Sequence, residues 1–299
     1  MSAEQTRRTS LLAAAALLAL AACWGSTFFM IKDLLERVPT LDFLAVRFGI
    51  AALVLLAVAP KALGRLSPVV RRHAVVLGLL YGVAQILQTA GLAHTPASIS
   101  GFVTGLYVVC TPLQAAAILR TRIPPVTWAA VALATVGLGV LALNGLSIGY
   151  GELITLASAV LYALHIVGLG AWSTAQDAVG MTILQIVVIA VVCTLATAHD
   201  GIVLPDRAAD WWAVVYMAVV VGALGLLGQT WAQAHLPPTR SAIIMSMEPV
   251  FASLFAVWLG GEDVTTRLLL GGGMVLVAML TVELAPRRAV EGEVPHIAV

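Results

Sequence analysis

Long apolar runs separated by short polar segments fill almost the whole chain. Ten runs of about twenty residues carry very few charged side chains, and each could cross a hydrocarbon core of about 30 Å as a helix. The runs are Leu11–Ile31, Leu41–Ala59, Ala74–Ala93, Ala97–Leu119 and Val126–Leu143, then Gly151–Gly170, Gly180–Ala198, Trp212–Ala234, Ser241–Leu259 and Leu268–Leu284. The pattern predicts an all-α, polytopic membrane protein with ten transmembrane helices.

The ten runs form two halves whose polar positions match. Gln88-Thr89, Ala93-His94, Pro96 and Ser100 recur 141 residues later as Gln229-Thr230, Ala234-His235, Pro237 and Ser241. Pro112 and Pro249 correspond at an offset of 137, which aligns Thr111 with Glu248. Because five spans are an odd number, the second half must enter the bilayer from the opposite side. We expect two inverted five-helix repeats, residues 1–146 and 147–299, with a site at their interface.

The composition agrees with a bilayer environment and suggests an orientation. Hydrophobic residues make up 61% of the chain and charged residues 10%, against about 25% charged in typical soluble domains. The net charge of +1 argues against a nucleic-acid partner. With the N-terminus inside, inner segments hold 11 Lys and Arg residues and outer segments 4. We therefore expect an inner-membrane protein with both termini cytoplasmic.

One alternative concerns the N-terminus. Arg7-Arg8, an apolar stretch and Leu20-Ala21-Ala22-Cys23 resemble a lipoprotein signal. The apolar run, however, continues past Cys23 to Ile31, which favours a full span. Cys23, Cys110 and Cys193 have no metal-ligand spacing, and isolated thiols in apolar runs are most often small hydrophobic residues.

Several motifs resemble one known family. They are Trp24-Gly25-Ser26-Thr27-Phe28, Arg47-Phe48, Gly105-Leu106-Tyr107-Val108-Val109 and Glu248-Pro249-Val250-Phe251-Ala252 with Gly261-Glu262. From Leu11 to about Leu284 the chain is similar to EamA-type transporters of the drug/metabolite transporter superfamily. The resemblance implies export of small metabolites or amino acids through a cavity lined by helices one to four and six to nine. The chain departs from the family where Thr121 replaces a frequent glutamate and Leu161-Tyr162 a frequent tryptophan.

Two charged residues lie at membrane depth, where each costs about 2.5–3.5 kcal/mol unless it has a partner or water. Glu248 precedes Pro249, whose ring loosens the helix. It is a candidate for substrate binding or proton coupling; alternatively it pairs with Arg47 or caps free backbone groups. Arg47 could bind a substrate carboxylate; alternatively it snorkels or pairs with Asp42.

Polar and aromatic side chains supply the remaining candidates. Tyr81, Gln85 and Gln88 share one face of the third run, and Gln229 and Gln233 share one face of the eighth. These faces should point into the bundle, because glutamines exposed to lipid would be unsatisfied. The predicted substrate-binding residues are Trp24, Thr27, Tyr81, Gln85, Gln88, Tyr107, His165, Gln229 and Glu248. Interhelical hydrogen bonding is the alternative for the glutamines, and a neutral, hydrogen-bonded state is the alternative for His165.

These features predict a secondary transporter that works by alternating access and exports small solutes such as aromatic amino acids or amphiphilic drugs. The sequence has no P-loop to bind ATP, no metal-ligand pair and no indication of a cofactor. A lipid-modifying membrane enzyme would need clustered acids and histidines, and a membrane scaffold would not explain an inverted repeat. We expect a small-molecule substrate, a lipid bilayer environment, protons as a possible coupling ion, and a monomer or homodimer.

Overall fold

The helices of the first half form five spans, two of which are interrupted. The computed structural model describes residues 3–120, 123–142, 149–197, 201–261 and 263–284. The first half contains α1 (Ala3–Gly25), α2 (Thr27–Leu34), α3 (Thr40–Val58), η1 (Leu63–Arg65), α4 (Pro68–Ala93), α5 (Ala97–Gly105), α6 (Tyr107–Leu119) and α7 (Pro125–Ala142). The first span is thus α1 with α2, and the fourth is α5 with α6.

The second half repeats this plan. It contains α8 (Tyr150–Trp172), α9 (Ala178–Thr197), α10 (Ala208–Tyr216), the π-helix η2 (Met217–Leu224), α11 (Gly225–Gln233), α12 (Pro238–Met245), α13 (Glu248–Trp258) and α14 (Thr266–Leu284). In the described residues, eight helical stretches are long and apolar enough to cross a membrane, and two shorter apolar helices complete the ten predicted spans. The predicted boundary near residue 146 lies outside the described residues.

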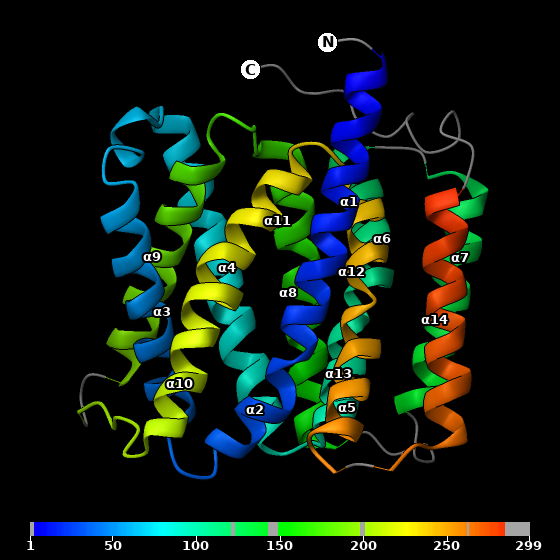
Figure 1. Cartoon of the computed structure of the whole chain (residues 1–299). Coiled ribbons are helices and arrows are strands. Elements are labelled where there is room, and N and C mark those ends of the chain that lie inside the picture. The colour runs from blue at the N-terminus through cyan, green and yellow to red at the C-terminus, as the bar shows by residue number, and fades with distance from the viewer. Residues whose placement is uncertain (1–2, 121–122, 143–148, 198–200, 262, 285–299) are drawn as a thin grey trace.

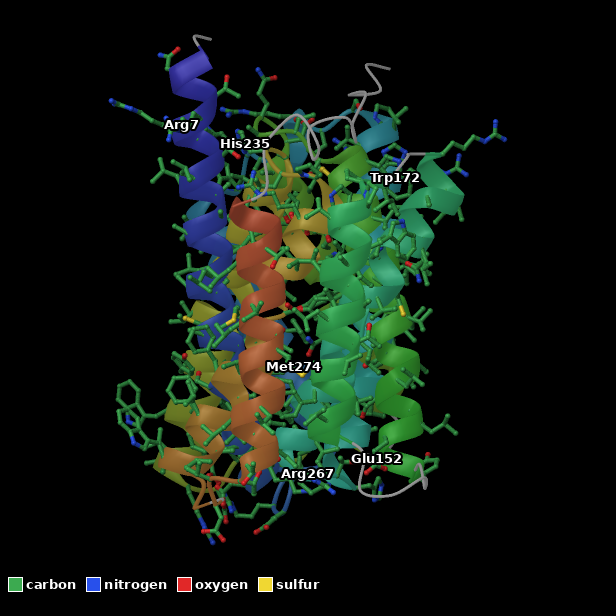
Figure 2. The ribbon with its side chains drawn as sticks, turned by 90° about the vertical axis from the view of Figure 1, so that its right-hand side faces the viewer. Arg7, Glu152, Trp172, His235, Arg267 and Met274 are labelled. Atoms are coloured by element: carbon green, nitrogen blue, oxygen red, sulfur yellow. The ribbon has the colours of Figure 1, made fainter. Side chains whose placement is uncertain are left out.

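Equivalent spans of the two halves run in opposite directions. In Figure 1, α5 lies below α6, whereas their counterparts are reversed, with α12 above α13. The first span of each half shows the same reversal. Helix α1 starts at the end of the bundle marked by Arg7, whereas α8 starts near Glu152 at the far end and finishes at Trp172 at the Arg7 end (Figure 2). The inverted arrangement predicted from the sequence is therefore present in the fold.

Three spans are broken in the middle of the bundle. The breaks fall at Ser26, at Leu106 and at Ser246-Met247. The sequence predicted continuous helices there, although it identified Pro249 as a loosened turn. The eighth span also differs from the prediction, because residues 217–224 form a π-helix between two α-helices. Irregular backbone at membrane depth is tolerated where it is buried in protein or lines a cavity.

The fifth and tenth spans, α7 and α14, pack against each other at one side of the bundle (Figure 1). Glycine allows the close approach: a Cβ on Gly137 would lie 2.8 Å from the Gly271 carbonyl oxygen. The main core cluster lies among the other spans and includes Phe43, Phe48 and Ile166. The peripheral position of α7 and α14 leaves the remaining spans to surround the centre.

Candidate functional site

A central cavity lies where the three broken spans meet. It is lined by Trp24, Thr27, Phe28, Ile31, Arg47, Tyr81, Gln85, Gln88, Thr89, Leu92, Thr104, Tyr107, Tyr162, His165, Ile166, Gln229, Met245 and Glu248. Its volume is about 50 Å³, which is room for a few water molecules. Typical ligand sites measure several hundred Å³, so this cavity is smaller than a typical ligand site.

Arg47 and the nine residues predicted to bind substrate all line this cavity. They come from spans one to four, six, eight and nine. The seventh span, which the family resemblance also assigned to the cavity, contributes no lining residue among the described positions. The sequence reasoning missed Tyr162, whose hydroxyl donates a hydrogen bond of 2.7 Å to Gln88 Oε1. The spacing of Tyr162 and His165, three residues apart on one helix, could have revealed it.

Arg47 is a buried cation that faces acceptors without a full charge. Its Nε donates to the Met217 carbonyl at 3.2 Å, and its Nη1 lies 3.5 Å from Gln85 Oε1. Its Cζ lies 5.1 Å from the centroid of the Phe48 ring. The alternative that Arg47 pairs with Asp42 is wrong, because Asp42 instead accepts hydrogen bonds from Thr197 Oγ1 and the Val203 amide. Snorkelling is excluded too, since Arg47 is only 3% exposed.

Glu248 is the first residue of α13 and is also buried. Neither Glu248 nor Arg47 has an ion-pair partner among the described residues, so the pairing considered from sequence is absent. Tyr107 begins α6 at the equivalent position of the first half, 141 residues earlier. When the two halves are aligned at their breaks, Tyr107 is the counterpart of Glu248. This replaces the sequence alignment, in which Thr111 was the counterpart. Tyr107 lies within electrostatic range of the Glu248 carboxyl.

The cavity wall contains both satisfied and unsatisfied polar groups. His165 Nε2 lies 2.8 Å from Gln185 Oε1, and Gln229 Nε2 donates to Gln233 Oε1 at 3.0 Å. Within the described part of the chain, His165 Nδ1 is buried without a hydrogen-bond partner. Because such a group is costly to leave unpaired, it is available to water or to a polar substrate.

Side chains of the first half hold the π-helix of the second half. Trp24 Nε1 donates to the Val221 carbonyl at 3.1 Å, and Arg47 binds Met217 four residues earlier in η2. At the start of this segment, Ser26 Oγ lies 2.9 Å from the Tyr216 hydroxyl. The break in the first span and the π-helix in the eighth are thus joined directly across the interface between the halves.

A separate cavity of about 850 Å³ opens between α2, the α4–α5 turn and α10. It shares no lining residue with the central cavity. Beside it, Arg37 bonds Asp33 at 2.6 Å and Asp210 at 2.8 Å, which joins the two halves. Hydrogen bonds with Asp210 and Asp33 raise the pKa of Arg37 above its ordinary value. Lys32 Nζ donates to the Leu92 and Thr95 carbonyls at 3.0 and 2.7 Å. The Arg37–Asp210 contact joins α2 to α10, and the Lys32 contacts join α2 to the end of α4 and the turn after it.

No group of three or more His, Cys, Asp or Glu side chains that could hold a metal ion occurs among the described residues. His94 and His235, the histidines of the repeated motif, both lie beyond helix ends. His94 stacks edge-on with Tyr150, and His235 Nδ1 lies 2.8 Å from the Trp231 carbonyl oxygen. Neither histidine lines the central cavity.

Comparison with known proteins gives consistent matches over nearly the whole chain. The model of the EamA-like transporter family matches twice, over residues 11–143 and 149–284. An "Uncharacterized transporter" of Archaeoglobus fulgidus is 26% identical over 266 residues, covering 87% of this chain and 82% of the relative. The "Uncharacterized inner membrane transporter YedA" of Escherichia coli K12 is 24% identical, with 90% of each chain covered. A solved structure described as "Crystal structure of protein" has a TM-score of 0.73 at 20% identity, covering 92% of this chain and 98% of its own.

Proposed function

Because the chain belongs to the EamA-like transporter family, it is a multi-pass membrane transporter, and we propose that its substrates are zwitterionic amino acids with an aromatic or other bulky side chain. The observation that carries this proposal is the pair Arg47 and Glu248. They are two ionisable groups of opposite type on the wall of one cavity, and neither forms an ion pair among the described residues. A zwitterion would supply a counter-charge to each.

The remaining lining supports the same class of substrate. Trp24, Tyr81, Tyr107 and Tyr162 surround the cavity with aromatic rings that favour a bulky apolar side chain. Arg47 has a planar fork of donors that suits a carboxylate. A cationic amphiphilic drug would satisfy Glu248 but would leave the buried guanidinium without an anion, so it is the weaker candidate.

Transport would proceed by alternating access between the two inverted halves. In this proposal, the contact between Arg37 and Asp210 joins α2 to α10 across the two halves and would have to break before solute leaves at the Arg37 end. A rocking movement of the two halves would separate α2 from α10 and release solute at this end. With both termini cytoplasmic in the inner membrane, the Arg37 end would be the outer face, and the direction would be export.

Glu248 is the candidate for proton coupling. It is buried, lacks a cationic partner among the described residues and begins the helix after a break. A carboxyl in this position could bind either the substrate ammonium group or a proton, but not both at once. This competition would couple substrate transport to proton transport in the opposite direction.

Counterflow in proteoliposomes tests the proposed substrate class. Purified protein is reconstituted with unlabelled L-phenylalanine inside, and entry of radiolabelled L-phenylalanine is followed without any pH gradient. We expect labelled solute to accumulate transiently above the level of protein-free vesicles. Absence of counterflow with phenylalanine, tyrosine, tryptophan, leucine and methionine would refute the class. Phenethylamine as the internal solute serves as the control that lacks a carboxylate.

A further inference from the structure

The π-helix η2 is the only described segment of its kind, and it lies directly behind the central cavity. A π turn contains more residues than an α turn, and π segments occur frequently at functional sites. Neither Met217 nor Val221 lines the cavity, but Arg47 and Trp24, which bind their carbonyls, both do. The backbone of this segment is therefore one hydrogen bond away from any molecule that occupies the cavity.

Gly225 allows the backbone just after this segment to lie close to Trp24. A Cβ on Gly225, the residue after η2, would lie 3.0 Å from Trp24 Nε1. Together with this close approach, the hydrogen bonds from Trp24 and Arg47 favour the π-helical hydrogen-bond pattern of the segment.

We propose that Trp24 and Arg47 are positioning residues that hold η2 in its π register, and that an anionic group in the cavity releases it by taking the Arg47 guanidinium from the Met217 carbonyl. The proposal rests on the proposed function in one respect, namely that the substrate carries a carboxylate. A carboxylate is the stronger acceptor for a guanidinium, because it carries a full negative charge and can accept two parallel N–H bonds from the planar fork.

Closure of the π turn would move the next helix. Once η2 tightens to an α-helix, the surplus residue turns α11 by up to about 100° and shifts it by about 1.5 Å. That helix carries Gln229, which lines the cavity, and Gln233, whose Nε2 donates to the Ile166 carbonyl of α8 at 3.0 Å. Binding at the cavity would in this way be transmitted to the contact between α11 and α8.

Hydrogen exchange of the full-length protein in nanodiscs tests the holding contacts without a ligand. In Trp24→Phe and Arg47→Lys, the freed segment should close, and amides of residues 217–225 should exchange about fivefold more slowly. Trp231→Phe is the matched control, because Trp231 lies on the same span as η2 but does not line the cavity. Unchanged or faster exchange in both variants would overturn the proposal, since faster exchange is the result of losing a merely stabilising contact.

The release step is tested with three probes of one shape. L-Phenylalanine and 3-phenylpropanoate carry a carboxylate, and phenethylamine does not. In the wild type, the two carboxylates should slow exchange in residues 217–225, phenethylamine should not, and Arg47→Lys should abolish the difference. Equal effects of all three probes would overturn the release step.

Probe binding is measured separately by thermal shift. A failure of the proposed substrate class can then be distinguished from a failure of the proposal about the π-helix. If no probe raises the melting temperature of the wild type, the proposed substrate class fails. The exchange rates of the ligand-free variants then still decide whether Trp24 and Arg47 hold the π register.

Discussion

Tyr107 and Glu248 occupy the same position in the two inverted repeats: each is the first residue after the break of its span. Both line the central cavity, and the Tyr107 hydroxyl lies within electrostatic range of the Glu248 carboxyl. The two halves therefore bring equivalent backbone breaks to the cavity but place different chemistry on them. This asymmetry leaves one carboxyl at the centre, where two facing carboxylates would repel each other.

Replacing Glu248 separates proton coupling from folding. Glu248→Gln keeps the side-chain shape but cannot exchange a proton, so uptake of labelled phenylalanine driven by a pH gradient should be abolished in proteoliposomes. Counterflow without a gradient should be retained at a reduced rate. Glu36→Gln, which changes an exposed carboxylate, should behave as wild type. A Glu248→Gln protein that follows the pH gradient as well as wild type would refute the coupling role.

The contact between His165 and Gln185 should contribute to stability. Gln185→Ala leaves a buried His165 nitrogen unpaired, which should cost about 1–3 kcal/mol of the free energy of unfolding and lower the melting temperature. Gln176→Ala, at an exposed position, is the control. Equal melting temperatures for the two variants would show that the hydrogen bond at 2.8 Å makes no net contribution.

Gly25 permits close packing of α1 against α13. An added Cβ would lie 2.7 Å from the Ala252 nitrogen and 2.7 Å from Phe251 Cβ, so Gly25→Ala should destabilise the fold by about 1–3 kcal/mol. Gly49 in α3 has no atom within 4 Å of the added Cβ, and Gly49→Ala should be neutral or stabilising by up to about 1 kcal/mol. Thermal unfolding of both variants checks whether the melting temperature falls for Gly25→Ala and stays the same or rises for Gly49→Ala.

Arg37 should control access from its end of the bundle. Arg37→Gln removes the hydrogen bonds to Asp33 and Asp210, so the halves should separate there more often. In a background with Cys23, Cys110 and Cys193 replaced by serine, Ile31→Cys should then react several-fold faster with an impermeant maleimide. Lys61→Gln, on another loop, is the control. Unchanged labelling would mean that this ionic contact does not limit opening.

The sequence was sufficient for the architecture and for most of the cavity wall. Apolar run length predicts a helix because a bilayer leaves no other way to satisfy the backbone, and the repeated Gln-Thr and His-x-Pro positions revealed the second half. Polar residues at membrane depth had to face inward, which is why Gln88, Gln229 and Glu248 were found in advance.

The interruptions of the spans could not be predicted in the same way. Ser26 and Leu106 are both compatible with a helix, so neither residue alone indicates a break in its span. The π register of η2 depends on Trp24 and Arg47, which are 197 and 170 residues away from the carbonyls they bind. Those distant contacts also determined the partner of Arg47, where the sequence suggested Asp42 or Glu248.

The central claim is that Arg47 and Glu248 receive the two charges of one solute. Equilibrium binding of L-phenylalanine, phenethylamine and 3-phenylpropanoate to the wild type, Arg47→Gln and Glu248→Gln tests it most directly. The account predicts that the wild type prefers phenylalanine to both analogues by about tenfold or more, as expected for charge-assisted hydrogen bonds worth about 1.5–3 kcal/mol. It also predicts that Arg47→Gln loses the preference over phenethylamine and Glu248→Gln the preference over 3-phenylpropanoate. Equal affinity of the wild type for all three compounds, or an unchanged preference in both variants, would contradict it.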